Sequence, residues 1–537
     1  MAAEALAAPP VRKALDRLLA ERTVSRIWKK DPSVWRKQPE RQAEIADRLG
    51  WLTAPEIAAG QVADLRAFAD EVRSAGFKHA AVLGMGGSSL CPEVLRATFS
   101  NAPGFPEPIV LDSTVPSAVE RVAATVDPAR SLFVVSSKSG TTTEPSVFFK
   151  YFYSLVLERL GDRAGGSFVA VTDPGTPLEK LARERGFRRV FPAQPDVGGR
   201  YSAFTHFGMV PAALLGLDLN ELVSRGVEMQ RRCSPGGDAE NPGAQLGAAL
   251  GGWYGEGRDK LTFIASPAIR SFGLWAEQLI AESTGKEGRG ILPIAGEQIG
   301  SLESYGDDRL FAYLRLDGDD NRVLDDRAAA LEAGGHPVIR LGLRDRYDIG
   351  AEFYRWEFAT AVAGALLGIH PFDQPNVQES KDNTVRVLKG FSATGGLPEV
   401  ESGGTLGELI VTARPGDYVA LMAYVEQTPE TDAAFENLRR WLLDRRRLPS
   451  TLGYGPRFLH STGQLHKGGK ANGLFVQFVQ PEAQGGPIPG EEYSFQVLVL
   501  AQAAGDLQAL RGHGRKAIRV KLGADPAAEV RKLGGSI

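Results

Sequence analysis

The stretch Ser137-Lys138-Ser139-Gly140-Thr141-Thr142-Thr143-Glu144-Pro145 decides the fold, because it sets five hydroxyls, a lysine and a glycine directly after an apolar run. That run, at residues 131–136, is typical of a buried parallel strand. Open α/β sheets bind ligands at the carboxyl ends of their strands. Hydroxyls, backbone N–H groups and the N-terminus of a following helix suit a phosphate, so the stretch predicts a phosphate-binding turn. The alternative is an ordinary Ser/Thr-rich loop that ends in a helix cap at Thr143.

A second turn of this kind lies earlier in the chain. The apolar residues 80–83 lead into Gly84-Met85-Gly86-Gly87-Ser88-Ser89, which again indicates a strand, a glycine turn and the start of a helix. The glycine spacing departs from the dinucleotide-binding fingerprint. Taken together, the two turns predict a sugar-phosphate site in which Gly87 and Ser88 cover the sugar. The substrate-binding residues predicted in the other turn are Ser137, Lys138, Ser139 and Thr142.

Apolar runs alternate with helical stretches along most of the chain, which is the pattern of doubly wound parallel sheets. In a first α/β unit, residues 76–195, we expect strands at 80–84, 108–112, 131–136 and 168–172. In a second, residues 196–389, we expect strands at 262–265, 310–316 and 337–342. A small third α/β unit, residues 400–537, follows a glycine-rich segment and has expected strands near 418–424, 474–479 and 516–521. Residues 1–75 carry helical spacing and predict a helical segment docked on these units.

The composition argues against several classes of protein. The 537 residues carry 62 basic and 65 acidic side chains, a net charge of −3, which argues against a nucleic-acid partner or an anionic membrane surface. No apolar stretch approaches the ~18 residues of a membrane span. Cys91 and Cys233 are too few for a disulfide framework or a metal knuckle and indicate a reducing cytoplasm. The seven histidines are scattered, so we expect no metal site.

Four further segments complete a pattern: Val197-Gly198-Gly199-Arg200-Tyr201-Ser202, Glu282-Ser283-Thr284-Gly285-Lys286, Gly296-Glu297, and Pro371-Phe372-Asp373-Gln374-Pro375-Asn376-Val377 with Lys381 after it. With the two turns, over residues 78–385, they resemble the phosphoglucose isomerase family, which is built on sugar-isomerase (SIS) domains. The resemblance implies an α/β fold with two doubly wound SIS-type domains. It also implies an isomerase that interconverts glucose 6-phosphate and fructose 6-phosphate through ring opening and a cis-enediolate, with no cofactor.

Two segments are similar to the isomerase half of bacterial transaldolase/phosphoglucose isomerase fusions. They are Trp356-Glu357-Phe358-Ala359-Thr360 and Gly453-Tyr454-Gly455-Pro456-Arg457-Phe458-Leu459-His460-Ser461-Thr462-Gly463-Gln464. We expect no transaldolase here, since about 75 residues precede the first strand and a (β/α)₈ barrel needs on the order of 200 or more.

The resemblance also assigns a base and a cation. One carboxylate can move a proton between C2 and C1, since both carbons lie on one edge of the enediol. Glu297 matches the family's base by its Gly-Glu setting, and its rivals in sequence are Glu303 and Glu282; the alternative for Glu297 is a solvated loop carboxylate. Arg200 matches the fixed cation that stabilises the enediolate, and the alternative is an arginine paired with solvent or a surface acid.

Ring opening requires an acid and a base close to the sugar oxygens. Lys381 stands six residues after Pro375, the spacing of the family's catalytic lysine, and the alternative is an exposed helical lysine. For the histidine we favour His460 over His336. The segment that begins at His460 is similar to a loop beside the catalytic glutamate of short bacterial members, whereas His336 is not a clean match; a structural role is the alternative for either.

Other functions stay open. A non-catalytic SIS protein that binds sugar phosphates would keep the phosphate turn without the catalytic residues. An amidotransferase of the glucosamine-6-phosphate synthase kind would need a nucleophilic cysteine where this chain has Ala2. An isomerase could also act on another aldose phosphate, such as mannose 6-phosphate. The partner we expect is a small sugar phosphate, with no nucleic acid and no membrane, in a cytoplasmic protein for which fold precedent suggests a homodimer.

Overall fold

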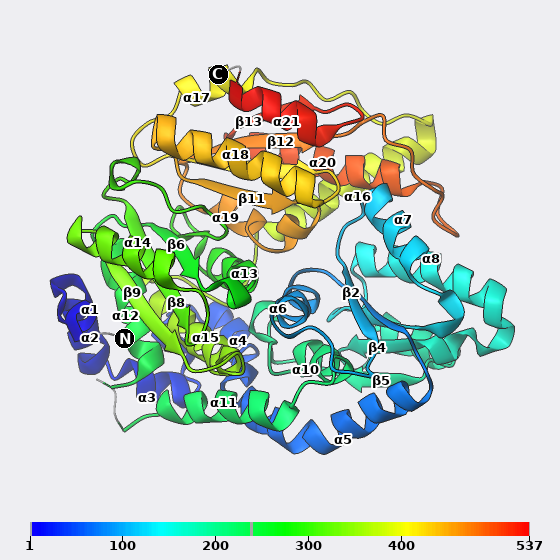
Figure 1. Ribbon diagram of the computed structural model, residues 1–537, viewed down its shortest axis with the longest axis horizontal. Helices are drawn as coiled ribbons and strands as arrows, with labels where there is room; N and C mark the ends of the chain where they lie inside the picture. The colour runs from blue at the N-terminus through cyan, green and yellow to red at the C-terminus, as the bar shows by residue number, and fades with distance from the viewer. Residues whose placement is uncertain (1–2, 237–239, 536–537) are drawn as a thin grey trace.

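Three parallel sheets, each in a lobe of its own, surround the middle of the molecule (Figure 1). The computed structural model describes residues 3–236 and 240–535. Every strand pair within these sheets is parallel, which confirms the predicted α/β class. Within the described ranges, no helix has the length and apolar character needed to cross a membrane.

The first sheet has the strand order β2-β1-β3-β4-β5. Its strands are β1 (His79–Leu83), β2 (Glu107–Leu111), β3 (Ser131–Ser136), β4 (Phe168–Thr172) and β5 (Arg189–Pro192). The helices between them are α6 (Leu90–Phe99), α7 (Pro116–Thr125), α8 (Thr143–Leu160) and α9 (Pro177–Glu184). Because β1 and β3 are neighbours, the two predicted turns that follow them meet at one edge of the sheet.

The second sheet has the order β7-β6-β8-β9. Its strands are β6 (Lys260–Ala265), β7 (Leu292–Ile294), β8 (Arg309–Leu316) and β9 (Val338–Leu343). Its helices are α10 (His206–Leu214), α11 (Leu219–Arg232), α12 (Pro242–Gly255), α13 (Phe272–Thr284), α14 (Arg322–Ala333) and α15 (Asp348–Leu367). Helix α15 packs against α11, α12 and α13, and both α13 and α15 are buried on nearly all sides.

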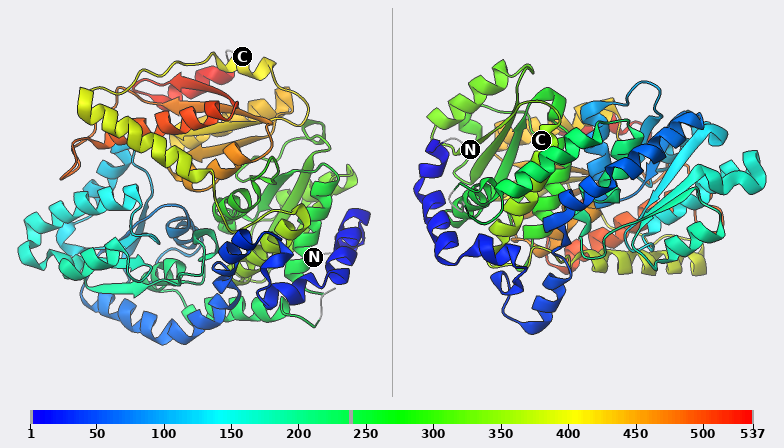
Figure 2. Two further views of the ribbon diagram at one scale, coloured as in Figure 1. Left: turned by 180° about the vertical axis from the view of Figure 1, so that it is seen from behind. Right: turned by 90° about the horizontal axis from the view of Figure 1, so that it is seen from below.

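The third sheet has the order β11-β10-β12-β13. Its strands are β10 (Tyr418–Tyr424), β11 (Ser450–Tyr454), β12 (Gly473–Val479) and β13 (Lys516–Lys521). Its helices are α17 (Leu406–Val411), α18 (Pro429–Arg446), α19 (Gly463–Gly468), α20 (Phe495–Gly512) and α21 (Pro526–Gly535). Helix α16 (Val377–Thr394) runs past the expected boundary near residue 390 and packs along α20 (Figure 2). We propose that the chain divides near residues 76, 196 and 400, with α16 joining the second and third units.

The N-terminal segment is helical and docks on the second unit. Its helices are α1 (Ala3–Ala7), α2 (Pro9–Ala20), α3 (Thr23–Trp28), α4 (Pro39–Ala46) and α5 (Ala54–Ser74). Trp28 Nε1 donates to the Cys233 carbonyl and Trp35 Nε1 to the Ala361 carbonyl, each at 2.8 Å. These anchors hold α4 close to the segment that follows α15.

A buried glutamine fastens the third unit to the second. The side chain of Gln464, on α19, donates to the Gly285 carbonyl at 2.9 Å and to Asn376 Oδ1 at 2.8 Å, and accepts from the Asn376 N–H at 2.9 Å. Gly468 lies in the same contact, where a Cβ would come 2.5 Å from Asn376 Oδ1 and 2.7 Å from the Gly285 oxygen. The end of α13, the start of α16 and α19 therefore meet with no spare room.

The substitution Gly468→Ala should lower the free energy of unfolding by about 1–3 kcal/mol, because the added methyl overpacks this junction. Gly390→Ala is the control: Gly390 lies in α16 and faces open space, so alanine should leave stability unchanged or raise it by up to about 1 kcal/mol. Chemical denaturation of both variants measures the difference. Equal stabilities would contradict the tight packing of the junction.

Candidate active site

Two glycines bring the turn after β1 against other parts of the chain. Gly86 has a φ of 54°, and a Cβ there would lie 2.9 Å from both Gln278 Nε2 and the His460 carbonyl oxygen. A Cβ on Gly87 would come 2.0 Å from the Gly199 oxygen. The turn therefore touches α13, the loop before Arg200 and the third unit. That Gly87 and Ser88 cover a sugar stays a prediction.

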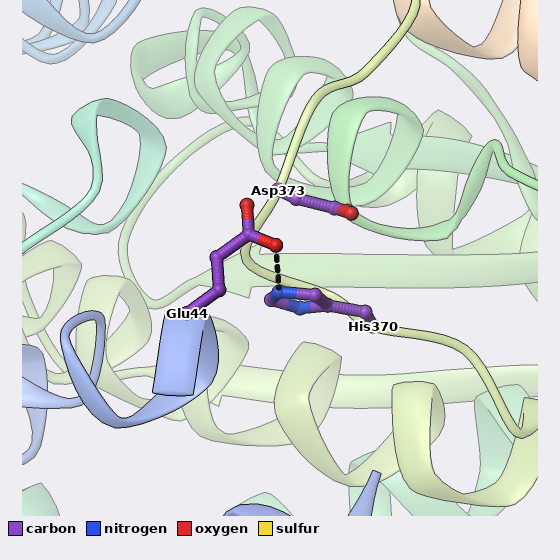
Figure 3. Close-up of side chains that lie close together, drawn as sticks. All are labelled: Glu44, His370 and Asp373. Carbon is purple, nitrogen blue, oxygen red and sulfur yellow. Dashed lines mark ion pairs between the residues drawn. The ribbon is translucent and has the colours of Figure 1, made fainter. Parts of the chain in front are cut away.

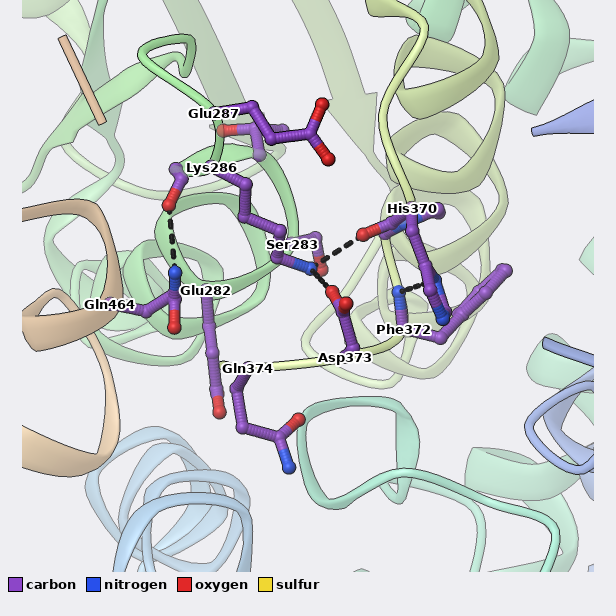
Figure 4. A network of polar contacts seen from close by, with 12 residues as sticks. Glu282, Ser283, Lys286, Glu287, His370, Phe372, Asp373, Gln374 and Gln464 are labelled. Carbon is purple, nitrogen blue, oxygen red and sulfur yellow. Dashed lines mark hydrogen bonds and ion pairs between the residues drawn. The ribbon is translucent and has the colours of Figure 1, made fainter. Parts of the chain in front are cut away.

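The Arg200 guanidinium is buried and held in one orientation. Its hydrogen-bond acceptors are Ser283 Oγ at 2.8 Å, Gln374 Oε1 at 3.1 Å, and the carbonyl oxygens of Pro371 at 2.7 Å and Asp373 at 2.9 Å. Its Nη1 also lies 3.4 Å from Glu282 Oε1. Figure 4 shows Glu282, Ser283, Asp373 and Gln374 at this place. Since its N–H groups are occupied by protein acceptors, Arg200 is a fixed cation with Glu282 as its carboxylate partner.

Glu282 is connected to the third unit through Gln278. Both residues lie on α13, four positions apart and therefore on one face of the helix. Gln278 Nε2 donates to Glu282 Oε2 at 3.1 Å and to the His460 carbonyl at 2.8 Å. One amide group thus sets the distance between the carboxylate and the segment that carries His460.

His460 forms a pair with Glu144 across 316 residues of sequence. It ends a short 3-10 helix, Arg457–His460, and its Nε2 lies 3.1 Å from Glu144 Oε1, which also accepts from Gln502 Nε2 at 2.7 Å. Burial alone would raise the pKa of Glu144, but His460 and the charge of Lys381 outweigh it and hold that pKa below its ordinary value. Lys381 itself is exposed near the start of α16. The structure therefore brings Arg200, Glu282 and the His460 segment together through Gln278, while the catalytic role of Lys381 stays a prediction.

In the predicted phosphate turn, the hydroxyls bond to one another. Ser137 Oγ donates to Thr142 Oγ1 at 3.0 Å, and the hydroxyls of Ser139 and Thr141 lie 2.9 Å apart. The Lys138 ammonium is directed elsewhere: it pairs with Asp173 Oδ2 at 2.7 Å and donates to two backbone carbonyls, while burial lowers its pKa. Four hydroxyls are thus grouped just before α8, but Lys138 is not turned toward them, and phosphate binding by this turn stays a prediction.

The structure does not bring Glu297 to Arg200. Its Oε2 accepts from Arg309 Nη2 at 3.0 Å in an ion pair whose side chains are only 3% and 1% exposed, and its charge also acts on Arg439. Glu303, the other rival, is exposed on the surface. The Gly-Glu setting therefore marks a carboxylate that is buried in an ion pair within the second unit, whereas Glu282 is the glutamate at the arginine.

His336 also lies apart from these residues. It precedes β9, and its ring is 5.7 Å from that of Phe311 and 5.9 Å from that of Tyr305. Burial lowers its pKa. These contacts place His336 in an aromatic cluster at the amino end of a strand, which favours a structural role.

Three residues of the site were not predicted to act there: Gln278, Glu144 and Gln374. The sequence carried a signal for two of them. Gln278 stands one helical turn before Glu282 among apolar residues, where a glutamine needs a polar partner, and Glu144 directly follows the predicted phosphate turn, at the start of the next helix. No local pattern indicates that Glu144 meets His460.

One group of side chains has the donor types of a metal site. Ligand atoms of Glu44, His370 and Asp373 lie within 4.8 Å of one another (Figure 3). Lys286 Nζ, however, already lies 2.6 Å from Asp373 Oδ1. A lysine ammonium beside the carboxylate disfavours a divalent cation there.

Comparisons with known proteins identify the family of this chain. A family model described as phosphoglucose isomerase matches residues 50–291, which include Arg200 and Glu282. A glucose-6-phosphate isomerase of Staphylococcus aureus (strain Newman) is 30% identical over 352 residues, covering 57% of this chain and 79% of the relative. The chain belongs to the phosphoglucose isomerase family. A further family member of that name, from Carboxydothermus hydrogenoformans, is 28% identical over 410 residues, covering 65% of this chain and 88% of the relative.

Two solved structures share the fold. A hypothetical protein from Thermus thermophilus has a TM-score of 0.59 at 24% identity, and the match covers 71% of this chain and 97% of that protein. A glucose-6-phosphate isomerase from Chlamydia trachomatis has a TM-score of 0.55 at 22% identity, and the match covers 69% of this chain and 78% of that protein.

The double substitution Ser139→Ala and Thr142→Ala should weaken binding of a phosphorylated inhibitor, since each lost hydroxyl bond to an anion is worth ~1.5–3 kcal/mol. The control is the same inhibitor without its phosphate, whose binding should barely change. Calorimetric titration of both ligands measures the difference. Equal weakening of the two would mean that the turn contacts the sugar carbons instead.

Proposed function

We propose that the chain is an aldose–ketose isomerase that interconverts glucose 6-phosphate and fructose 6-phosphate, the activity for which its relatives are named. The observation that carries the proposal is the position of Glu282, which contacts Arg200 directly and the His460 segment through Gln278. A base, a fixed cation and a histidine–glutamate pair are thereby grouped beside one glycine turn. For this reason we assign the base to Glu282 rather than to Glu297.

The His460–Glu144 pair suits ring opening. With Glu144 ionised, the imidazole hydrogen on Nε2 is donated to the carboxylate, so Nδ1 is the nitrogen left to exchange a proton with a sugar oxygen. Lys381, an exposed cation whose charge reaches Glu144, supplies the second group for the same step. Together they would protonate the ring oxygen and remove the proton from O1.

Glu282 and Arg200 suit the transfer of the proton. Glu282 would take the C2 proton and return it to C1 while the enediolate passes a proton from O2 to O1, and Glu282 is neutral while it holds the C2 proton. At that moment Arg200 loses its carboxylate partner, just as negative charge develops on the enediolate oxygens. Because the guanidinium is already fixed by its acceptors, it can stabilise this charge without rearranging.

The other features of the proposal follow from this chemistry. Both steps are proton transfers, so the proposal includes no cofactor and no metal. The hydroxyls of the turn at residues 137–142 would bind the substrate phosphate. We place the enzyme in the cytoplasm, since its two cysteines, Cys91 and Cys233, are free and buried. A homodimer and activity on mannose 6-phosphate stay predictions; a sugar-phosphate-binding protein without catalysis is the second candidate, and an isomerase assay separates the two.

The substitution Glu282→Gln should abolish exchange of the C2 proton of the substrate with deuterated water, because the amide has nearly the same shape but cannot act as a base. We expect a loss of at least about a hundredfold, the usual size of general-base effects. Nuclear magnetic resonance of the substrate measures the exchange. Binding of a phosphorylated inhibitor shows whether the pocket is intact.

The matched control is Glu297→Gln. It should lower stability, because it breaks the buried pair with Arg309, yet the folded enzyme should exchange the C2 proton at a rate near that of the parent. The reverse outcome would return the base to Glu297. An inactive parent enzyme would refute the proposed function itself.

The substitution His460→Ala should reduce turnover of the cyclic sugar by tenfold or more and turnover of a substrate supplied in open-chain form far less, because only the cyclic form needs ring opening. His336→Ala should have little effect on turnover of either substrate form, since the His336 ring packs in the aromatic cluster before β9. Steady-state kinetics with both substrate forms measure the ratios. A selective effect of His336→Ala would transfer the role to His336.

A further inference from the structure

The orientation of Arg200 depends on the loop at residues 370–374. Three of its four hydrogen-bond acceptors belong to this loop: the carbonyl oxygens of Pro371 and Asp373, and the Gln374 side chain. The loop lies outside the helices and strands, so no regular backbone pattern holds it in place. Whatever fixes the loop also fixes the direction of the guanidinium.

Lys286 fixes this loop from behind. Its Nζ lies 2.6 Å from Asp373 Oδ1 and donates to the His370 carbonyl at 2.6 Å (Figure 4). The side chain is 2% exposed, so this ammonium is withdrawn from solvent and its contacts are not screened by water. Lys286 stands four residues after Glu282, on the segment that leaves α13. One ammonium therefore ties the loop that aims Arg200 to the helix that carries Glu282.

The charges around Asp373 show why an ammonium, and not a metal ion, belongs here. Besides Lys286, Arg41 of the N-terminal segment lies 3.6 Å from the other carboxylate oxygen, Asp373 Oδ2. The His370 Nδ1 accepts from the Phe372 N–H at 3.2 Å, so the neutral ring carries its hydrogen on Nε2, 3.6 Å from Glu44 Oε2. Burial lowers the pKa of His370 to about 3 and keeps it neutral. Two cations already balance the Asp373 carboxylate.

We propose that Lys286 is a positioning residue for catalysis: its ammonium holds the loop at residues 370–374, and the loop carbonyls hold Arg200 where enediolate charge develops. This inference rests on the proposed isomerase function. It assigns no contact between Lys286 and the substrate. The loss of Lys286 should therefore impair stabilisation of the charged intermediate much more than binding of the neutral parts of the sugar.

The test compares Lys286→Met with Lys260→Met. Lys260 is an equally buried lysine, 1% exposed, with two carboxylate partners, Asp259 at 2.6 Å and Asp308 at 2.9 Å, but it touches neither Arg200 nor its loop. The probes are a six-carbon sugar alcohol 6-phosphate and the matching sugar acid 6-phosphate, whose carboxylate resembles the enediolate in charge. The measurements are kcat, the dissociation constants of both probes, and the melting temperature.

Both variants should melt at lower temperature than the parent. Lys286→Met should lower kcat at least tenfold and raise the dissociation constant of the sugar acid at least tenfold. The dissociation constant of the sugar alcohol should change less than threefold. Lys260→Met should leave kcat and the dissociation constants of both probes within about twofold of the parent's values. A parent without isomerase activity would refute the proposed function, whereas an active parent and a folded Lys286→Met with unchanged kcat would overturn only this inference.

Two other results would overturn it as well. One is equal weakening of both probes by Lys286→Met, which would indicate general damage to the pocket. The other is stoichiometric binding of Co²⁺ by the parent that is lost in His370→Ala, which would make the cluster a metal site. If Lys286→Met does not fold, Asp373→Asn tests the inference instead, because it removes the same ion pair and keeps the backbone carbonyl. It should weaken binding of the sugar acid selectively, as expected for Lys286→Met.

Discussion

A guanidinium that is only 2% exposed, as in Arg200, destabilises a protein unless acceptors surround it. Here the acceptors come from segments far apart in sequence: Ser283 on α13 and the loop at residues 370–374. Arg200 itself follows the first sheet. These elements must therefore be packed together before the charge can be buried without loss. For this reason the site around Arg200 is complete only when the first two units are packed against each other.

The sequence predicts the central strands of each sheet but misses one edge strand in each. Runs such as residues 131–136 lie fully buried in the middle of a sheet, so every position is apolar or small and the pattern is unmistakable. The strands β5, β7 and β11 were not predicted. They lie at sheet edges, have three to five residues each, and include Pro192, Pro293 or Gly453, which local propensity assigns to loops. Their pairing depends on the neighbouring strand, which a local pattern does not contain.

The same limit applies to the site. The turns at residues 84–89 and 137–142 can be predicted because a strand, a turn and a helix follow one another in the chain. The glutamate that faces Arg200 cannot be predicted in this way, because Glu282 and Glu297 are both candidates by their local setting. Only the direction of α13 and the ion pair between Glu297 and Arg309 distinguish them. Likewise, the predicted turn does not reveal that Lys138 pairs with Asp173, because that contact depends on the strand beside it.

Gln278 gives the third unit a direct part in the geometry of the base. Its single amide group donates to Glu282 and to the His460 carbonyl, so a displacement of the His460 segment alters the hydrogen bonding of the carboxylate. Proton transfer is steeply sensitive to such displacements, since an error of about 1 Å can cost a hundredfold in rate. In the proposed mechanism, ring opening at His460 and proton transfer at Glu282 therefore share one geometrical constraint. The junction at Gln464 fastens α19 to the end of α13 and so holds the third unit in a fixed position beside Glu282, as the proposed mechanism requires.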